Sequence, residues 1–263
     1  MKTSHRVEYL HLGQSGFRFK INELIVYIDP YLSDSIERIE GSGLKRQVPI
    51  KIQPNKIDDA NYVLITHIHL DHCDLDTLIP IAASSPKCKF IAPNIVCNYL
   101  LEMGFSKDRL MSASDSWIGI ENDIRIHATP AAHPVISYDD EGFMECVGYV
   151  IEVMGKNLIY HAGDTFLVDE LVMALKRLGP IELAMLPVNE HNYFKEKQGI
   201  LGNMSLKEAF GLAELLNFSR MVPMHWDMFK DNSLSAEEIL LGYNYRQPSF
   251  ALSIESEQSI IFK

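Results

Sequence analysis

The chain has 263 residues, with 24 Lys and Arg against 35 Asp and Glu, which gives a formal net charge of −11. This acidic balance and the absence of a Lys/Arg cluster argue against a nucleic-acid-binding surface. No apolar run approaches the ~18–20 residues of a membrane span, and the first residues have no signal-peptide pattern. The four cysteines form no CxxC pair, which is typical of reduced thiols. We expect a cytoplasmic, globular, single-domain protein over residues 1–263.

Short strands are predicted in the first third of the chain, and a GQSG turn separates the first two of them. Residues 30–59 carry clustered Gly, Pro, Ser and Asp and are expected to be irregular. A continuous apolar run at residues 62–66 predicts a strand buried on both faces, followed by a helix. The strands are expected at 7–12, 16–20, 24–28, 62–66 and 89–92, and the helices at 75–83 and 93–103.

The rest of the chain alternates strands and helices more regularly. Two capping boxes, Ser205 with Glu208 and Ser235 with Glu238, predict helix starts. The strands are expected at 124–129, 147–153, 158–161, 183–187 and 221–224, and the helices at 168–178, 205–216 and just after 235. Strands in both halves with helices between them predict a layered α/β architecture with two sheets.

Three histidines fall within six residues in the segment HIHLDH, which follows the buried strand at 62–66. In an extended segment, residues two apart face the same way, so His67, His69 and Asp71 are expected to converge, and His72 turns as the helix begins. Imidazole and carboxylate together suit divalent cations such as zinc. One such histidine would be an ordinary loop residue, but the whole pattern at a strand end favours a metal site.

Further nitrogen and oxygen donors follow later strands, at His133, Asp164 and His225. Each of these residues alone is as compatible with a capping role as with a ligand role. Together with the HIHLDH segment they provide seven donors, enough for two metal ions. His127 is an alternative to His133, although a histidine on a strand face is more often structural.

The sequence resembles the metallo-β-lactamase superfamily, and within it the branch that contains L-ascorbate-6-phosphate lactonase. The resemblance covers nearly the whole chain, and its most specific part is HxHxDH with the downstream His, GDT and His. It implies a four-layer αββα sandwich, the metallo-β-lactamase fold. The motifs that carry it are LGQSGF, IDPYLSDS, VLITHIHLDH, GFSKDRL, IYHAGDT and VPMHWDMF.

The resemblance also implies two divalent metal ions, zinc or manganese, and assigns their ligands. His67, His69 and His133 would hold one ion. Asp71, His72 and His225 would hold the other, and Asp164 would bridge them. Asp29 and Asp71 would form the catalytic set: Asp71 would orient or deprotonate the nucleophile, and Asp29 would support the ligands from behind.

This ligand set implies a metal-dependent hydrolase in which a metal-bridging hydroxide attacks an ester, since metal coordination lowers the pKa of water to about 7. The expected substrate is a small-molecule lactone, a sugar-acid lactone or its phosphorylated form. A phosphodiesterase or a thioesterase on the same site is an alternative, as is a mononuclear iron persulfide dioxygenase. A non-catalytic metal-binding module is the least favoured reading, because every ligand position is retained.

The segment 189–197 follows a strand end and offers groups for an anionic substrate, with a solvated polar loop as the alternative. We therefore expect His191, Tyr193 and Lys195 to bind substrate. Cys73, Trp117 and Trp226 are interpreted as core residues. We expect a small anionic substrate, no nucleic-acid or membrane partner, and allow for a homo-oligomer.

Overall fold

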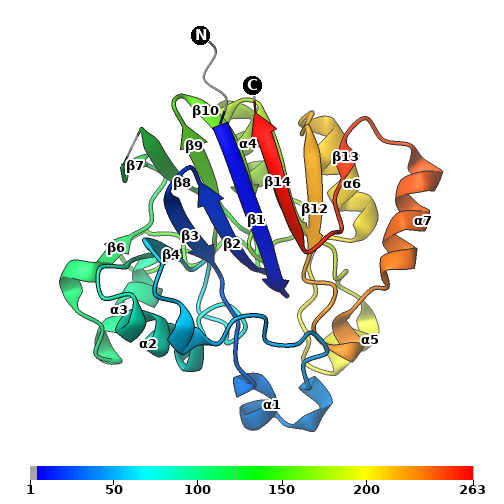
Figure 1. Cartoon of the computed structure of the whole chain (residues 1–263). Coiled ribbons are helices and arrows are strands. Elements are labelled where there is room, and N and C mark those ends of the chain that lie inside the picture. Colours follow the sequence, from blue (N-terminus) through cyan, green and yellow to red (C-terminus); the bar gives the residue numbers. More distant parts are fainter. Residues whose placement is uncertain (1–4, 122, 263) are drawn as a thin grey trace. The chain divides into compact units, whose positions relative to one another are not determined.

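The computed structural model describes residues 5–121 and 123–262, drawn as a ribbon in Figure 1. The chain divides into two compact units. The first runs to Ala113 and also includes Asp139–Glu145 and the chain from Glu255 onward, and the second comprises Ser114–Tyr138 and Cys146–Ile254. Within the described residues, each unit contains one seven-stranded mixed sheet.

The sheet of the first unit begins with an antiparallel meander and continues with parallel strands. Strands β14, β1, β2 and β3 are antiparallel neighbours, and β4, β5 and β6 then follow β3 in parallel. The parallel half places the carboxyl ends of β3, β4 and β5 along one edge, where ligands commonly bind in such sheets. The strands are β1 (His5–Gly13), β2 (Gly16–Ile21), β3 (Leu24–Ile28), β4 (Tyr62–Leu64), β5 (Lys89–Ala92), β6 (Leu110–Ser112) and β14 (Glu257–Phe262).

Two helices of the first unit, α2 (Leu75–Ser84) and α3 (Asn94–Glu102), bury apolar side chains in the same core as β4 and β5. Leu78 and Leu100 are fully buried there together with Val63 and Phe90. The Asp74 carboxylate caps α2 by accepting the backbone N–H of Asp76, which fixes the start of the helix directly after the HIHLDH segment. The remaining helical segments of the unit are α1 (Ser35–Glu40), η1 (Ser42–Leu44), η2 (Pro54–Lys56) and η3 (Lys107–Arg109).

The second unit repeats this plan, because an antiparallel β7–β8–β9–β10 meander leads into parallel β11, β12 and β13. Its strands are β7 (Ile118–Gly119), β8 (Ile124–Pro130), β9 (Val147–Val153), β10 (Lys156–His161), β11 (Ile181–Pro187), β12 (Arg220–Met224) and β13 (Ala251–Leu252). Its helical segments are α4 (Asp169–Leu178), α5 (Tyr193–Lys197), α6 (Leu206–Leu215), α7 (Ala236–Arg246) and η4 (Lys230–Asn232). Both predicted capping boxes are present, at the starts of α6 and α7.

Most predicted elements are confirmed within one or two residues, and the differences have local causes. The predicted irregular stretch 30–59 contains the helix α1, whose six residues are too few for a clear periodic pattern. Trp117 and Trp226 are half-buried rather than core residues. The Trp226 indole N–H donates to the Pro223 carbonyl, and Trp117 lies under the Arg125 guanidinium. Cys73 is buried in the apolar core, as predicted. In the part of the chain that is described, no helix is long and apolar enough to cross a membrane.

Candidate metal centre

The donors of the first unit follow the carboxyl ends of β3 and β4. Asp29 comes directly after β3, and its backbone N–H donates to the Leu64 carbonyl of β4. The HIHLDH segment is a turn and not the extended strand end that we predicted, because the N–H groups of His72 and Cys73 both bond to the His69 carbonyl. His67 and His69 nevertheless converge, with their Nε2 and Nδ1 atoms 3.0 Å apart.

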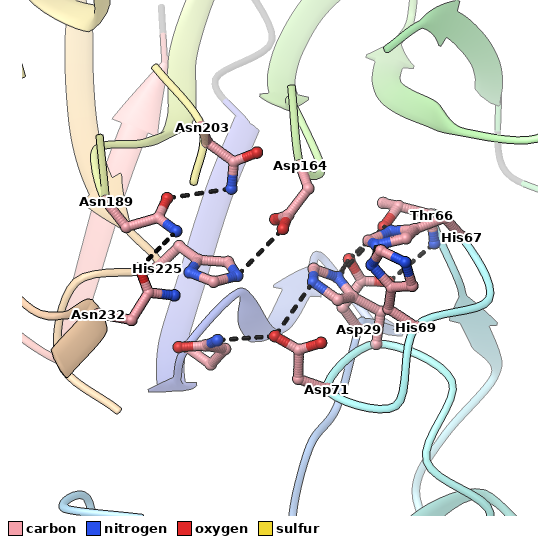
Figure 2. Close-up of polar contacts among 12 residues, drawn as sticks. Asp29, Thr66, His67, His69, Asp71, Asp164, Asn189, Asn203, His225 and Asn232 are labelled. Atoms are coloured by element: carbon pink, nitrogen blue, oxygen red, sulfur yellow. Dashed lines mark hydrogen bonds and ion pairs between the residues drawn. The ribbon is translucent and has the colours of Figure 1, made fainter. Parts of the chain in front are cut away.

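Asp29 orients two of these histidines, His72 directly and His67 through Thr66. Figure 2 labels Asp29, Thr66 and His67. The Asp29 carboxylate, which is fully buried, accepts the N–H and the O–H of Thr66 at 2.8 and 2.7 Å and His72 Nδ1–H at 2.7 Å. Since the Thr66 hydroxyl donates to Asp29, its oxygen accepts from His67 Nδ1 at 3.0 Å. Both imidazoles are therefore held with Nδ1 protonated, which leaves Nε2 to bind a cation. Asp29 acts through these two rings as a positioning residue.

Gln14 reaches the same group of residues, a contact that the sequence did not reveal. Its side-chain N–H₂ donates to Asp71 Oδ2 at 2.7 Å, and the same oxygen lies 3.6 Å from His72 Nε2. Gln14 lies in the turn between β1 and β2 and is 1% exposed. The GQSG sequence predicted the turn, but nothing in it indicated where the amide would point.

The donors of the second unit follow β8, β10 and β12, and all three are buried. Asp164 Oδ2 lies 3.1 Å from His225 Nε2 and 3.8 Å from His133 Nε2. His225 has a φ of +60°, a left-handed backbone conformation that costs free energy in a residue other than glycine. Asp29 has a φ of +45° at the corresponding point after β3. Such strain is often found at functional sites.

Three buried asparagines support the loops of the second unit (Figure 2). The Asn203 amide donates to Asn189 Oδ1 at 3.0 Å, and the Asn189 amide donates to Asn232 Oδ1 at 3.2 Å. Neighbouring backbone bonds connect these loops to the ligand segments, since Val188 N–H donates to the Met224 carbonyl and Met204 N–H to the Thr165 carbonyl. The network therefore fixes the segments that carry Asp164 and His225.

His127, the alternative to His133, lies elsewhere in the second unit. Its ring packs edge-on against Trp117 at 4.9 Å between centroids, and burial lowers its pKa. This is the environment of a structural histidine. His133, in contrast, faces the Asp164 carboxylate.

The three predicted substrate residues lie on and next to α5. The Tyr193 side chain is 65% exposed, and the His191 ring packs edge-on against Phe166. The Lys195 ammonium donates to the carbonyls of Asn189 and Glu190 at 2.6 and 3.1 Å. Lys195 therefore stabilises its own loop, and burial lowers its pKa.

The spacing and chemistry of the donors fit divalent metal ions in both units. Two nitrogen or oxygen ligands of one tetrahedral zinc, each bonded at about 2.0–2.1 Å, are about 3.3–3.4 Å apart. The corresponding separations here are 3.0 and 3.6 Å in the first unit and 3.1 and 3.8 Å in the second. The neighbouring Cys73 is no competitor, because burial raises the pKa of its thiol to about 12 and the thiolate is the form that binds metals.

Known proteins are similar to this chain in sequence and in fold. Residues 25–226 match the family described as a beta-lactamase superfamily domain. A UPF0173 metal-dependent hydrolase of Thermococcus onnurineus (strain NA1) is 29% identical over 235 residues, which cover 88% of this chain and 90% of that protein.

Two solved structures are similar in fold. Igni18, a metallo hydrolase from the hyperthermophilic archaeon Ignicoccus hospitalis KIN4/I, has a TM-score of 0.73 at 22% identity, with coverage of 98% of this chain and 99% of that one. An isothiocyanate hydrolase from Delia radicum gut bacteria has a TM-score of 0.74 at 18% identity, with coverage of 97% and 98%. The chain belongs to the beta-lactamase superfamily and has the metallo-β-lactamase fold. Membership and the names of its relatives support a metal-dependent hydrolase.

Proposed function

We propose that this chain is a metal-dependent hydrolase that opens a small-molecule lactone, a sugar-acid lactone or its phosphorylated form. The observation that carries the proposal is the pair of donor sets, one in each unit, whose separations match those of ligands on a shared cation. The preference for a lactone comes from the sequence resemblance to the ascorbate-6-phosphate lactonase branch.

The proposed ligands follow the superfamily pattern. His67, His69 and His133 would hold one zinc or manganese ion. Asp71, His72 and His225 would hold a second, and Asp164 would serve both. When bound, such ions activate water at neutral pH and stabilise negative charge that develops on a carbonyl or phosphoryl oxygen.

The chain's own residues supply the orientation and a proton acceptor. Asp29 holds His72 Nδ1 and Thr66, so that the imidazoles present their Nε2 atoms before any ion arrives. Asp71 has a side chain that is 17% exposed, compared with 0% for Asp29 and 4% for Asp164. A group that accepts a proton from water must later release it to solvent, and Asp71 is the carboxylate of the three with that access.

An anionic substrate is compatible with the net charge of −11. Two divalent cations add four positive charges against two negative charges from Asp71 and Asp164, so the loaded site is locally positive. We propose that His191, Tyr193 and Lys195 contact the substrate, with Lys195 contributing a positive charge from α5. The acidic surface disfavours a long polyanion and leaves small phosphorylated or carboxylated molecules acceptable.

The test is a hydrolysis screen of the zinc- or manganese-loaded protein on lactones, phosphodiesters, thioesters and isothiocyanates, the last because a protein of similar fold is named for that activity. We expect lactone opening that is lost when His67 and His69 are both replaced by alanine. Cleavage of another class alone would reassign the substrate. Full metal loading with no hydrolysis would indicate a binding module, and a single tightly bound iron would favour the persulfide dioxygenase.

A further inference from the structure

The turn between β1 and β2 holds Gln14 in a strained and buried position. Gln14 has a φ of +57° and is 1% exposed, and His11 Nε2 donates to its carbonyl at 3.1 Å. The His11 ring in turn stacks on Phe17 at 4.6 Å. A left-handed backbone and a buried amide both cost free energy, so this arrangement persists because the surroundings enforce it.

The same turn lies against the backbone of Asp29. A side chain at Gly16 would place its Cβ 3.1 Å from the carbonyl oxygens of Asp29 and Gly13, which is tighter than ordinary contacts. Glycine at this position therefore lets the chain pass close to the backbone of Asp29, the residue whose carboxylate orients His72. Gln14 is thus carried by a segment whose own position is fixed relative to Asp29.

The Gln14 amide contacts the proposed metal ligand Asp71 at one defined oxygen. Oδ2 accepts the Gln14 N–H at 2.7 Å and lies 3.6 Å from His72 Nε2. This bond restricts the rotation of a side chain that lies on the turn before α2. The donor is a neutral amide, so Asp71 keeps its full negative charge for a cation.

We infer that Gln14 is a positioning residue, which fixes the Asp71 carboxylate for metal binding without neutralising it. This inference rests on the proposed metal-dependent function and deepens it. A lysine at position 14 would reach the same oxygen with a positive charge and repel the cation. A side chain of similar size without a donor would remove this restraint on Asp71.

Metal affinity tests the inference directly, by calorimetric titration of the metal-free full-length protein with zinc and with manganese. Loss of a residue that orients a metal ligand typically costs 10–100-fold in affinity. We expect a loss of about this size in Gln14→Met, and near wild-type affinity in Gln14→His, whose ring Nε2–H has a similar reach. Gln198→Met, on the exposed end of α5, is the matched control and is expected to bind normally.

A double-mutant cycle separates positioning from a purely structural role. If Gln14 acts through Asp71, Gln14→Met should cost little additional affinity in an Asp71→Asn background. Wild-type affinity in Gln14→Met, whatever its thermal stability, would overturn the inference. Should Gln14→Met fail to fold, Gln14→Lys and Gln14→His provide the test. We expect the lysine variant to bind metal more weakly than the histidine variant. Equal metal affinities of these two variants would refute the inference. A wild-type protein that binds no divalent metal would instead refute the proposed function.

Discussion

Replacing Asp29 by asparagine tests how a buried carboxylate sets the imidazole of His72. Asparagine has nearly the same shape and tolerates the left-handed backbone, here with a φ of +45°, so the fold around the residue should persist. The amide oxygen can keep the bond from the Thr66 N–H. The amide nitrogen, however, cannot accept His72 Nδ1–H, which now bonds to Asp29 at 2.7 Å.

The expected effect follows from the tautomer of His72. With an N–H₂ group facing Nδ1, the ring is stabilised with its proton on Nε2, and that atom then has no lone pair for a metal. Loss of such a supporting carboxylate costs about 10–100-fold in metal affinity, which corresponds to about 1.4–2.7 kcal/mol. Asp29 Oδ2 also accepts the Thr66 O–H, so two buried hydrogen bonds to a charged group are lost, and each loss lowers the free energy of unfolding by about 1.5–3 kcal/mol.

Three measurements address this prediction, each against Asp58→Asn as a control at an exposed aspartate. Calorimetry gives the metal affinity, urea unfolding of the metal-free protein gives the stability, and imidazole nitrogen NMR gives the tautomer of His72. We expect Asp29→Asn to lower the metal affinity, to lower the free energy of unfolding and to move the proton of His72 to Nε2. Unchanged metal affinity together with an unchanged tautomer would refute the reasoning, because the role assigned to Asp29 depends on that single proton.

Three further predictions concern the second unit. Gly148→Ala would put a Cβ 2.8 Å from the His161 carbonyl oxygen and 2.9 Å from the Ala162 carbonyl oxygen. We therefore expect the turn that leads to Asp164 to shift and the metal content to fall several-fold. The control Gly119→Ala, whose Cβ would have no neighbouring atom within 4 Å, should bind metal normally. Burial lowers the pKa of His127, so below about pH 6.5 the unfolded chain binds a proton that the folded chain lacks, and the free energy of unfolding falls as the pH falls. His127→Phe should make the free energy of unfolding less dependent on pH in urea titrations at pH 5–7. An unchanged pH dependence would contradict the structural role of His127. Lys195→Met should raise KM for an anionic lactone with kcat unchanged, whereas a lowered Tm with unchanged KM would assign Lys195 to its loop alone.

The sequence predicted the regular elements well because their signals are local. The strand at 147–153 has the predicted bounds, and both capping boxes are in place. The final strand β14 was not predicted because it needs a partner far away in the chain, and α1 was not predicted because its six residues are too few for a clear periodic pattern. β14 pairs with β1 across the whole length of the sequence, and no local pattern carries that information.

The candidate ligands were predictable in kind, but the arrangement that holds them was not. HIHLDH, His133, Asp164 and His225 stand out because they follow several strands and together provide seven donors, although each residue alone is as compatible with a capping role. The support depends on tertiary contacts: Gln14 meets Asp71 across 57 positions, and Asn189 meets Asn232 across 43. An amide in a turn has no sequence signature for the direction in which it points, so these residues emerge only from the fold.

If the two donor sets bind metal, the number of ions per chain shows it most directly. Native mass spectrometry of the purified protein, with elemental analysis to identify the metal, measures that number. We predict two zinc or manganese ions per wild-type chain, and a loss of bound metal when His67 and His69 are both replaced by alanine while the far-ultraviolet circular dichroism stays the same. A chain that holds one tightly bound iron, or no metal at saturating zinc and manganese, would contradict the account.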